Sequence, residues 1–454
     1  MPALDDALLD LVDALEGAGL DPHALVVARD GAVLARAAWA PYATDRAALV
    51  YSVSKSVTAL AVLLLAHEGR LGLDDPVHRH VDLPNPHGIT LRQLLTMTTG
   101  HSREQTLAMP VDPRVLLTTA PAHPVGTRFA YSSPATATLA RVVAAVAGAQ
   151  PSVYLRPRLL DPVGVGPRWW TPLDGVEQGF SGLHLTVEDQ VRLGTALAGG
   201  STVLPASLVT TVATTFVPTV ATGAHDAGAE PDPTAPDWAR GYGYGVWASR
   251  HGFRMDGAYG QFTLVVPETG VVVAYQGATT DTQRTLDALW RLVEAAGDQD
   301  AGDPDAVGVP TPWHRDSWDA RDRLVPAGGS DATGPDSTGW SLTDRGPDAW
   351  RLTIPPAAAE PGGSLDVDAH RWTRGVLTPV AGDGVVPVAA RAERRPDGTV
   401  VAHLVCTASP HRLLLTRSPA GELRADWRTA PLWRPALSTL LVPAWVSEPA
   451  PGVP

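Results

Sequence analysis

The chain has 454 residues, of which 44% are hydrophobic, and a formal net charge of −13 at pH 7. This composition is that of a globular protein with a sizeable core and two or three domains, and it excludes disordered and fibrous classes. The acidic charge and the lack of any basic run argue against nucleic acid and anionic membranes as partners. The longest apolar stretch, residues 57–66, is too short for a membrane span and predicts a buried helix.

The N-terminus and the cysteine count favour a cytoplasmic location. The first ten residues, MPALDDALLD, are acidic where a signal peptide needs a basic start. Cys406 is the only cysteine, so no intrachain disulfide can form and secretion gains no support. We therefore expect a cytoplasmic protein without a membrane segment, and the sequence leaves its oligomeric state open.

The first two thirds of the chain predict an α/β (α+β) fold. A helix is expected over 3–18, followed by a hairpin within 24–40 whose strands meet at Asp30-Gly31, and a second helix over 52–68. The order of hairpin, long helical insertion, three strands and closing helix indicates an antiparallel sheet whose first and last strands meet, rather than a βαβ repeat. Further helices are expected over 91–98, 135–147, 186–197 and 282–296, and strands over 244–247, 262–266 and 271–276.

The remainder of the chain divides into a linker and a small all-β domain. Residues 298–339 are rich in Gly, Pro and Asp, with a short helix expected around 318–324. Beyond them, short alternating runs separated by turn residues predict strands over 340–446. The expected organisation is thus one domain over 1–297, with a mobile loop at 219–237, then the linker and the β domain. Four tryptophans are expected to fill the core of the β domain: Trp340, Trp350, Trp372 and Trp427.

The use of basic residues singles out one position. Of the 35 basic residues, 34 are arginine and Lys55 is the only lysine. Arginine keeps its proton in proteins, whereas a buried lysine can become a neutral amine. In a chain that favours arginine wherever a positive charge suffices, a retained lysine indicates a task that needs deprotonation. The alternative is that a single lysine remains there by chance.

Lys55 belongs to a Ser-x-x-Lys motif, Ser52-Val53-Ser54-Lys55, at the start of a predicted helix. Residues three apart share a helix face, so the Ser52 hydroxyl and the Lys55 amine can hydrogen-bond. A serine hydroxyl needs an adjacent base near pH 7, and a neutral lysine serves when its pKa falls from about 10.4 by about three units. The helix N-terminus also offers a backbone N–H to an oxyanion. Ser54 is a rival nucleophile that lacks this spacing.

A second polar segment, Tyr131-Ser132-Ser133, follows a turn and precedes the helix expected over 135–147. A tyrosine beside a lysine can share its proton and pass it to a leaving group. Taken by itself, this motif is more typical of a half-buried core tyrosine.

Together these residues resemble the serine β-lactamase and penicillin-binding-protein superfamily, in particular its class C-like branch of esterases, amidases and D-aminopeptidases. The resemblance runs over roughly residues 5–297 and implies a β-lactamase/transpeptidase-like antiparallel sheet flanked by helices, with a helical subdomain. Four further stretches carry it, in the expected order: Val57 to Asp75 with HEGRLGLDDPV, ITLRQLLTMTTGH at 89–101, PVGTRFAYSS at 124–133, and Gly182-Leu183-His184-Leu185-Thr186 with Asp189.

The resemblance assigns roles to the two motifs and identifies a third. Ser52 would be the acylated nucleophile, Lys55 its general base, and Tyr131 the partner that helps to move the proton. Ser133 falls where relatives often carry Asn, as a contact to a substrate amide. The family's third motif, Lys-Thr-Gly or His-x-Gly, matches the stretch from Arg254 to Gln261.

This third motif departs from the family pattern. With Gly257 as its glycine, Ala258 supplies the second oxyanion N–H and Met255 occupies the cationic position. The loss of a carboxylate-binding lysine disfavours penicillin-like substrates and favours an ester or amide without that anion. His251 or Arg254 are the residues able to restore a positive charge.

The expected function is a serine hydrolase that cleaves a small-molecule ester or amide through a Ser52 acyl-enzyme, without metal or organic cofactor. Alternatives are β-lactamase or D-amino-acid amidase and peptidase activity, acyl transfer to an amine or alcohol, and a catalytically silent binding protein with the same fold. The β domain is expected to shape one wall of the cleft, rather than to bind a carbohydrate or peptide. His78-x-His80 resembles a metal pair but fits a loop after a helix better.

Overall fold

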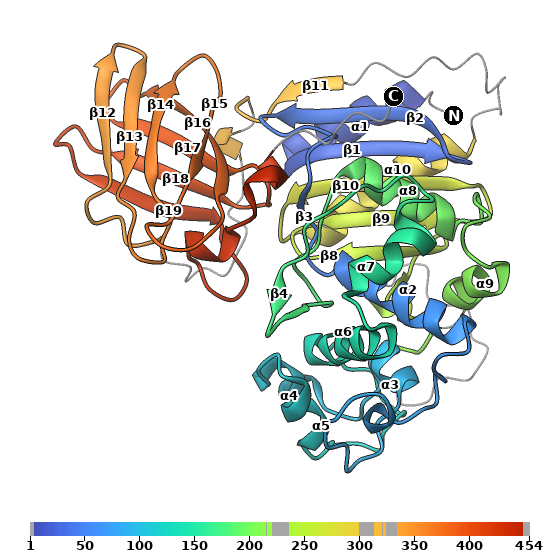
Figure 1. Ribbon diagram of the computed structural model, residues 1–454. Coiled ribbons are helices and arrows are strands. Elements are labelled where there is room, and N and C mark those ends of the chain that lie inside the picture. Colours follow the sequence, from blue (N-terminus) through green and yellow to red (C-terminus); the bar gives the residue numbers. More distant parts are fainter. Residues whose placement is uncertain are drawn as a thin grey trace.

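The computed structural model describes residues 4–214, 216–219, 236–298, 313–319, 321–323 and 334–447. It consists of a sheet flanked by helices, here called the α/β part, and a body of strands beside one end of that sheet, the β part (Figure 1). This arrangement confirms the predicted fold class. Most of the predicted mobile loop (219–237) and of the predicted linker (298–339) lies outside the described residues. Among the helices of the described ranges, none combines the length and apolar composition that a membrane crossing needs.

The α/β part is built on a seven-stranded sheet in the order β11-β2-β1-β10-β9-β8-β7. Strands β1 (Asp21–Arg29) and β2 (Ala32–Ala40) form the predicted hairpin, because Asp30 and Gly31 adopt the positive φ values of 49° and 83° that a tight turn requires. Strand β10 (Val271–Ala278) pairs antiparallel with β1, so the first and last predicted strands meet. The other strands are β7 (Trp247–Ala248), β8 (Phe253–Gly257), β9 (Gln261–Val266) and β11 (Trp313–Asp316).

Three details of this sheet differ from the sequence prediction. Strand β7 begins three residues later than the predicted strand at 244–247, and β8 was not among the predicted strands. The sequence of β8, FRMDG, alternates apolar and polar residues over only four positions, and its charged Arg254 is fully buried, so the strand gives a weak signal in the sequence. Strand β11, inside the predicted linker, pairs parallel with β2 and makes the sheet mixed.

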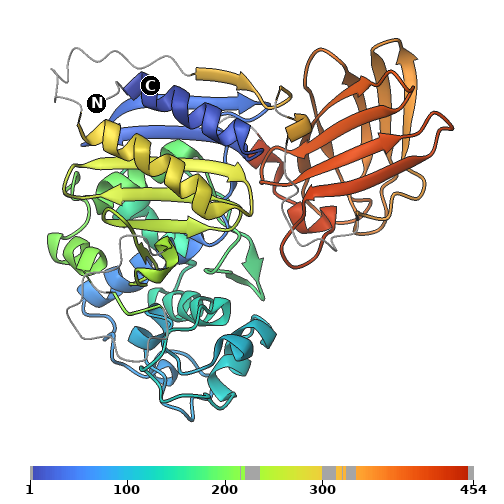
Figure 2. The same ribbon diagram turned by 180° about the vertical axis from the view of Figure 1, so that it is seen from behind.

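The sheet is covered on both faces, which explains why β1 is buried along nearly its whole length. Leu25 and Val27 point to one face, where they pack against α1 (Leu4–Gly17) and α10 (Thr282–Gly297). Ala24, Val26 and Ala28 point to the other, against Val187 and Val191 of α8 (Val187–Leu197). Figure 2 shows α1 and α10 side by side on the first of these faces.

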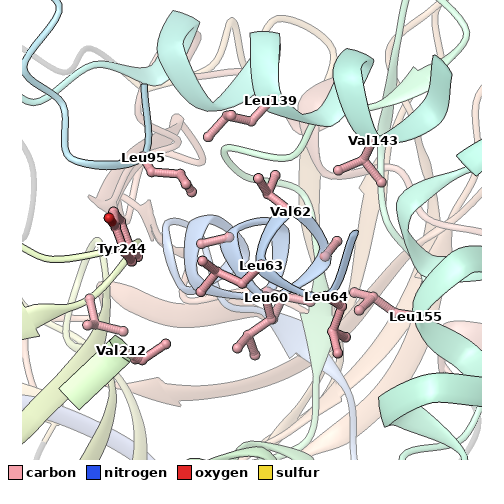
Figure 3. Packing of buried hydrophobic residues seen from close by; sticks show 14 of the residues in the cluster. Leu60, Val62, Leu63, Leu64, Leu95, Leu139, Val143, Leu155, Val212 and Tyr244 are labelled. Carbon is pink, nitrogen blue, oxygen red and sulfur yellow. The ribbon is translucent and has the colours of Figure 1, made fainter. Parts of the chain in front are cut away.

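Helix α2 (Val53–His67) lies at the centre of the helical region, and its burial fixes the residue that precedes it, Ser52. From Ala59 to Ala66 its sequence is apolar on all sides, as expected for a helix without a solvent face. Leu60, Val62, Leu63 and Leu64 are surrounded by side chains from several elements (Figure 3). The other helices of the region are α3 (Leu91–Leu95), α4 (Arg103–Ala108), α5 (Pro113–Thr118), α6 (Ser133–Ala147), α7 (Pro151–Leu155) and α9 (Ala206–Thr214), and its short strands are β3 (Ala48–Leu49), β4 (Pro172–Leu173), β5 (Val176–Glu177) and β6 (His184–Leu185).

The β part contains two antiparallel sheets, β12-β13-β14 and β15-β16-β17-β18-β19, that share one apolar core. Trp350 and Trp427 are buried in this core and Trp340 packs against it, as predicted. Trp372 was assigned wrongly, because it lies outside this core and donates a hydrogen bond to Asp316 Oδ1 at 2.8 Å. The strands are β12 (Ser341–Gly346), β13 (Ala349–Ile354), β14 (Gly363–Asp368), β15 (Thr373–Leu377), β16 (Val386–Arg394), β17 (Val400–Cys406), β18 (Arg412–Arg417) and β19 (Leu423–Thr429).

Buried polar contacts dock the β part onto the α/β part. Arg412, which is fully buried, pairs with Asp21 at 3.0 Å and contacts Ser317 Oγ at 3.3 Å. The Tyr259 hydroxyl donates to the Ala430 carbonyl at 2.5 Å. Removing either partner of a buried ion pair leaves an uncompensated charge, so these contacts hold the two parts in one orientation.

Candidate active site

The structure brings together the serine and lysine of the Ser-x-x-Lys motif. Ser52 is the residue just before α2, and Lys55 lies one helical turn further along. The Lys55 Nζ is hydrogen-bonded to Ser52 Oγ at 2.9 Å. The rival Ser54 is fully buried, donates to the Tyr51 carbonyl at 2.6 Å and accepts from the Leu183 N–H, so its hydroxyl holds the backbone together.

The environment of Lys55 favours its neutral form. The side chain is only 2% exposed, and burial lowers its pKa from 10.5 to about 7. The negative charge of Asp256 opposes this effect by raising the pKa. At pH 7 a substantial fraction of the amine is therefore unprotonated and able to accept the proton of Ser52.

Phe180 supplies the second hydrogen-bond partner of Lys55, and the sequence reasoning missed it. Its carbonyl accepts from Lys55 Nζ at 2.9 Å. The loop that carries it is fixed on both sides, because the Thr58 hydroxyl donates to the Gly179 carbonyl at 2.9 Å and Trp170 Nε1 donates to the Ser181 carbonyl at 2.7 Å. A backbone contact of this kind leaves no signature in the sequence, since any residue type can provide it.

Tyr131 completes the group. Its ring centroid lies 4.9 Å from Lys55 Nζ, and the side chain of Ser52 is near enough to lower the pKa of its hydroxyl. The ring stacks on Trp247 with centroids 5.7 Å apart, which fixes its plane. Burial raises the pKa of Tyr131 above its usual value, so the group is a protonated phenol at neutral pH and can donate. Ser133, the first residue of α6, is partly exposed two positions further on.

The strand β8 lines the site and ends in the third motif. A Cβ at Gly257 would lie 2.3 Å from the carbonyl oxygen of Val50, so only glycine allows this strand to approach the segment before Ser52. The next residue, Ala258, packs with Tyr51 and Tyr259 beside the same segment. Gly257 and Ala258 therefore lie where the third motif is expected, next to the nucleophile helix.

The cationic position of the third motif carries no charge. Met255 is fully buried in the core that surrounds α2. The two cations considered as replacements are engaged elsewhere: His251 Nε2 lies 3.5 Å from Glu294 Oε1 on α10, and Arg254 Nε lies 2.9 Å from Asp256 Oδ2. A carboxylate on a substrate therefore meets no unengaged cation from this stretch.

Asp256 is a residue of the site that the sequence reasoning did not single out. Its side chain is 12% exposed, and its charge acts on both Lys55 and Tyr131. Burial raises the pKa of the Asp256 carboxyl, against the opposing charge of Arg254. Its place beside Gly257 in the third motif was the available signal, since that position faces the site in an alternating strand.

The segment before Ser52 is held by the β part. Tyr51 has a φ of 48°, a strained value for a residue with a side chain, and its backbone directs the chain into α2. The Tyr51 hydroxyl lies 2.7 Å from His411 Nε2, and the Leu49 N–H donates to the Ala408 carbonyl at 2.9 Å. Residues that position Ser52 thus come from both parts of the molecule.

The segment around His78-x-His80 is held by the carboxylate of Asp75. His80 Nε2 lies 2.9 Å from Asp75 Oδ2, and Arg79 Nη1 lies 2.7 Å from Asp75 Oδ1. These contacts are those of a loop held by one carboxylate, in line with the preferred reading of the sequence. No group of three or more His, Cys, Asp or Glu side chains suited to a metal ion occurs within the residues that the structure describes.

Comparison with known proteins identifies the family of this chain. The family model described as Beta-lactamase matches residues 12–298, which contain all the site residues above except His411 and Ala408. No curated protein matches the chain.

Several solved structures share the fold. The D-amino acid amidase from Ochrobactrum anthropi SV3, complexed with L-phenylalanine amide, is 18% identical with a TM-score of 0.51, covering 64% of this chain and 98% of that one. EstCE1, a hydrolase with promiscuous acyltransferase activity, is 17% identical with a TM-score of 0.51, covering 65% and 98%. SurE is 20% identical with a TM-score of 0.50, and the match covers 93% of this chain and 98% of SurE. The likeness to SurE thus extends over the β part as well.

Proposed function

Since this chain belongs to the beta-lactamase family and is a serine hydrolase, we propose that it cleaves a small-molecule ester or amide through an acyl-enzyme on Ser52. The observation that carries the proposal is the buried Lys55 amine, 2.9 Å from the Ser52 hydroxyl and with a pKa of about 7. A base of this pKa is well matched to taking a proton at neutral pH.

In the first half of the reaction, Ser52 Oγ attacks the substrate carbonyl and its proton passes to Lys55. The backbone N–H groups of Ser52 and Ala258 stabilise the oxyanion. This assignment is supported by the close approach of Gly257 to the Val50 carbonyl, because it brings the backbone at Ala258 near the backbone at Ser52. Tyr131, protonated and beside both Ser52 and Lys55, passes a proton to the leaving group and recovers one from Lys55. Water then attacks the acyl-enzyme by the reverse sequence of proton transfers and releases the acid.

The substrate is an ester or amide without the carboxylate that penicillins carry. Met255 gives such an anion no partner, and Asp256 adds a negative charge to the site. Acyl transfer to an amine or alcohol instead of water would use the same residues, and EstCE1, which shares the fold, is described as having promiscuous acyltransferase activity. Amidase activity on D-amino acids is a second candidate, because the D-amino acid amidase from Ochrobactrum anthropi SV3 shares the fold.

The test is intact-protein mass spectrometry after reaction with a fluorophosphonate or a penicillin. We expect a stoichiometric fluorophosphonate adduct in the wild-type protein and none in Ser52→Ala. Ser54→Ala serves as the matched control, because it removes a hydroxyl of structural function two residues away and should keep the adduct. We expect little or no penicillin adduct.

Two outcomes would overturn the proposal. An adduct that survives in Ser52→Ala would assign the nucleophile to another residue. The absence of both an adduct and turnover of p-nitrophenyl esters would favour a catalytically silent binding protein.

A further inference from the structure

A pocket of about 360 Å³ lies where the α/β part meets the β part. We call it the junction pocket. The α/β part contributes Tyr51 and Ser181, among others, and the β part contributes the loop 431–434 and the segment 438–442. Its volume is in the range of pockets that hold small organic groups.

The lining of the junction pocket includes residues next to the candidate active site. Tyr51 immediately precedes Ser52, and Ser181 immediately follows Phe180, whose carbonyl contacts the Lys55 amine. The Trp433 ring lies 5.8 Å from the Phe180 ring and 6.4 Å from the Tyr51 ring, between centroids. The pocket lining thus begins one residue away from Ser52 and one residue away from Phe180 along the chain.

The pocket exposes large apolar side chains to solvent. Trp433 is 63% exposed and its neighbour Leu432 is 47% exposed. Adjacent exposed apolar side chains at the rim of a pocket are typical of a binding surface, because a ligand that covers them removes apolar area from water. An aromatic ligand gains further from stacking on the indole.

The loop that carries Trp433 is fixed at both ends. The Tyr259 hydroxyl donates to the Ala430 carbonyl at 2.5 Å, and Ser438 Oγ donates to Glu360 Oε1 at 2.6 Å. Between them, Trp427 Nε1 donates to the Pro435 carbonyl at 3.1 Å. An indole held in place before binding spares a ligand the entropic cost of ordering the loop.

The charges of the lining residues favour an uncharged occupant. Burial lowers the pKa of His184 to about 4, so this residue is neutral at pH 7. Arg434 is the one lining residue with a formal charge, and its largely exposed guanidinium lies 3.9 Å from Glu360. The remaining contacts come mainly from apolar and hydroxyl-bearing side chains.

We propose that the junction pocket binds an apolar, preferably aromatic, group of the substrate, and that Trp433 is its principal contact. The inference rests on the proposed function, since it assigns a part of the molecule that Ser52 attacks. The β part is then a specificity element of the hydrolase.

The test compares Trp433→Ala with Trp445→Ala, a tryptophan of the β part that is 47% exposed and lies outside the pocket. One pair of substrates varies the acyl group, p-nitrophenyl acetate against p-nitrophenyl phenylacetate. A second pair varies the leaving group, ethyl acetate against benzyl acetate. In one of these pairs we expect Trp433→Ala to lower kcat/KM about tenfold for the aromatic member, mainly through KM, and less than about twofold for the other. The pair that responds tells which side of the scissile bond enters the pocket.

Two results would refute the inference: an equal loss for aromatic and small substrates in both pairs, or the same selective loss in Trp445→Ala. A binding measurement separates this inference from the proposed function. Equilibrium dialysis of benzyl phenylacetate against Ser52→Ala should show binding that weakens about tenfold when Trp433→Ala is added. If the wild-type protein turned over none of the esters, the proposed function would fail, and this binding would still decide the inference.

Discussion

The buried amine of Lys55 should make the stability of the protein depend on pH in a way that Lys55→Met removes. In the unfolded chain the lysine has its ordinary pKa of 10.5, and in the folded protein burial lowers this value to about 7. Between these values the unfolded chain binds more protons, so the free energy of unfolding rises with pH. Below pH 7 the lysine is charged in both the folded protein and the unfolded chain, so the folded protein carries the full cost of burying the ammonium group.

The size of the effect follows from the two pKa values. At or below pH 7 the cost of the buried charge amounts to roughly 4–5 kcal/mol, and at pH 9 to roughly 2 kcal/mol. Relative to Lys55→Met, the wild-type protein should therefore gain about 2 kcal/mol of stability between pH 7 and pH 9. The variant also deprives the Phe180 carbonyl of its donor, but that cost does not change with pH and cancels in the comparison.

Urea unfolding of both proteins at pH 7 and pH 9 measures the effect, with Ser52→Ala, which keeps the lysine, as the control. Because the chain contains a single lysine, NMR of protein labelled with ε-¹³C-lysine gives one side-chain resonance whose titration reports the pKa directly. Two results would refute the assignment of Lys55 as a neutral base. One is a difference in unfolding free energy between the wild-type protein and Lys55→Met that is the same at both pH values. The other is a lysine resonance that still reports a protonated amine at pH 9.

Three further predictions concern residues around the site. Asp256→Asn removes the charge that raises the pKa of Lys55, so the acidic limb of kcat/KM against pH should move to lower pH. Gly257→Ala places a Cβ against a backbone oxygen at 2.3 Å and should lower acylation of Ser52 by fluorophosphonate at least about tenfold. Arg412→Ala leaves Asp21 buried without its partner and should cost about 3–5 kcal/mol in urea unfolding.

Each of these predictions has a control. Asp256→Glu restores the carboxylate and should return the acidic limb toward its wild-type position. Gly17→Ala adds a Cβ where no atom lies within 4 Å and should leave acylation unchanged. Arg424→Ala removes a largely exposed arginine paired with Asp426 and should cost less than about 1 kcal/mol. An unshifted limb, an unchanged acylation rate, or equal losses for the two arginines would contradict the respective arguments.

The elements that sequence reasoning located are those whose signal is local. The pair of Ser52 and Lys55 follows from helical spacing, and the hairpin follows from Asp30-Gly31 between two apolar runs. Strand β8 was missed because its alternating stretch is short and because it buries a charged residue, Arg254, which pairs with Asp256 at 2.9 Å. Local patterns thus predict an element well where its apolar residues are buried and its polar residues are exposed. They predict it poorly where a strand buries charged side chains.

The parts of the site that escaped prediction are contacts between distant segments. The Phe180 carbonyl meets Lys55 across 125 positions, and His411 meets Tyr51 across 360. Neither contact depends on a residue pattern near the motif, so only the folded backbone reveals it. For the same reason the sequence placed Trp372 in the core of the β part, while the fold places it at Asp316, beside the edge strand β11.

The hydrogen bond between Tyr51 and His411 also has a consequence in time. A ribosome adds roughly 5–20 residues per second, so the 360 positions between these residues take roughly 20–70 s to translate. During that interval the nascent polypeptide contains Ser52 and Lys55 but not the segment with His411. For most of it, strand β10, which pairs with β1, has not been synthesised either. The growing chain should therefore remain unreactive toward esters until the segment around His411 has been made.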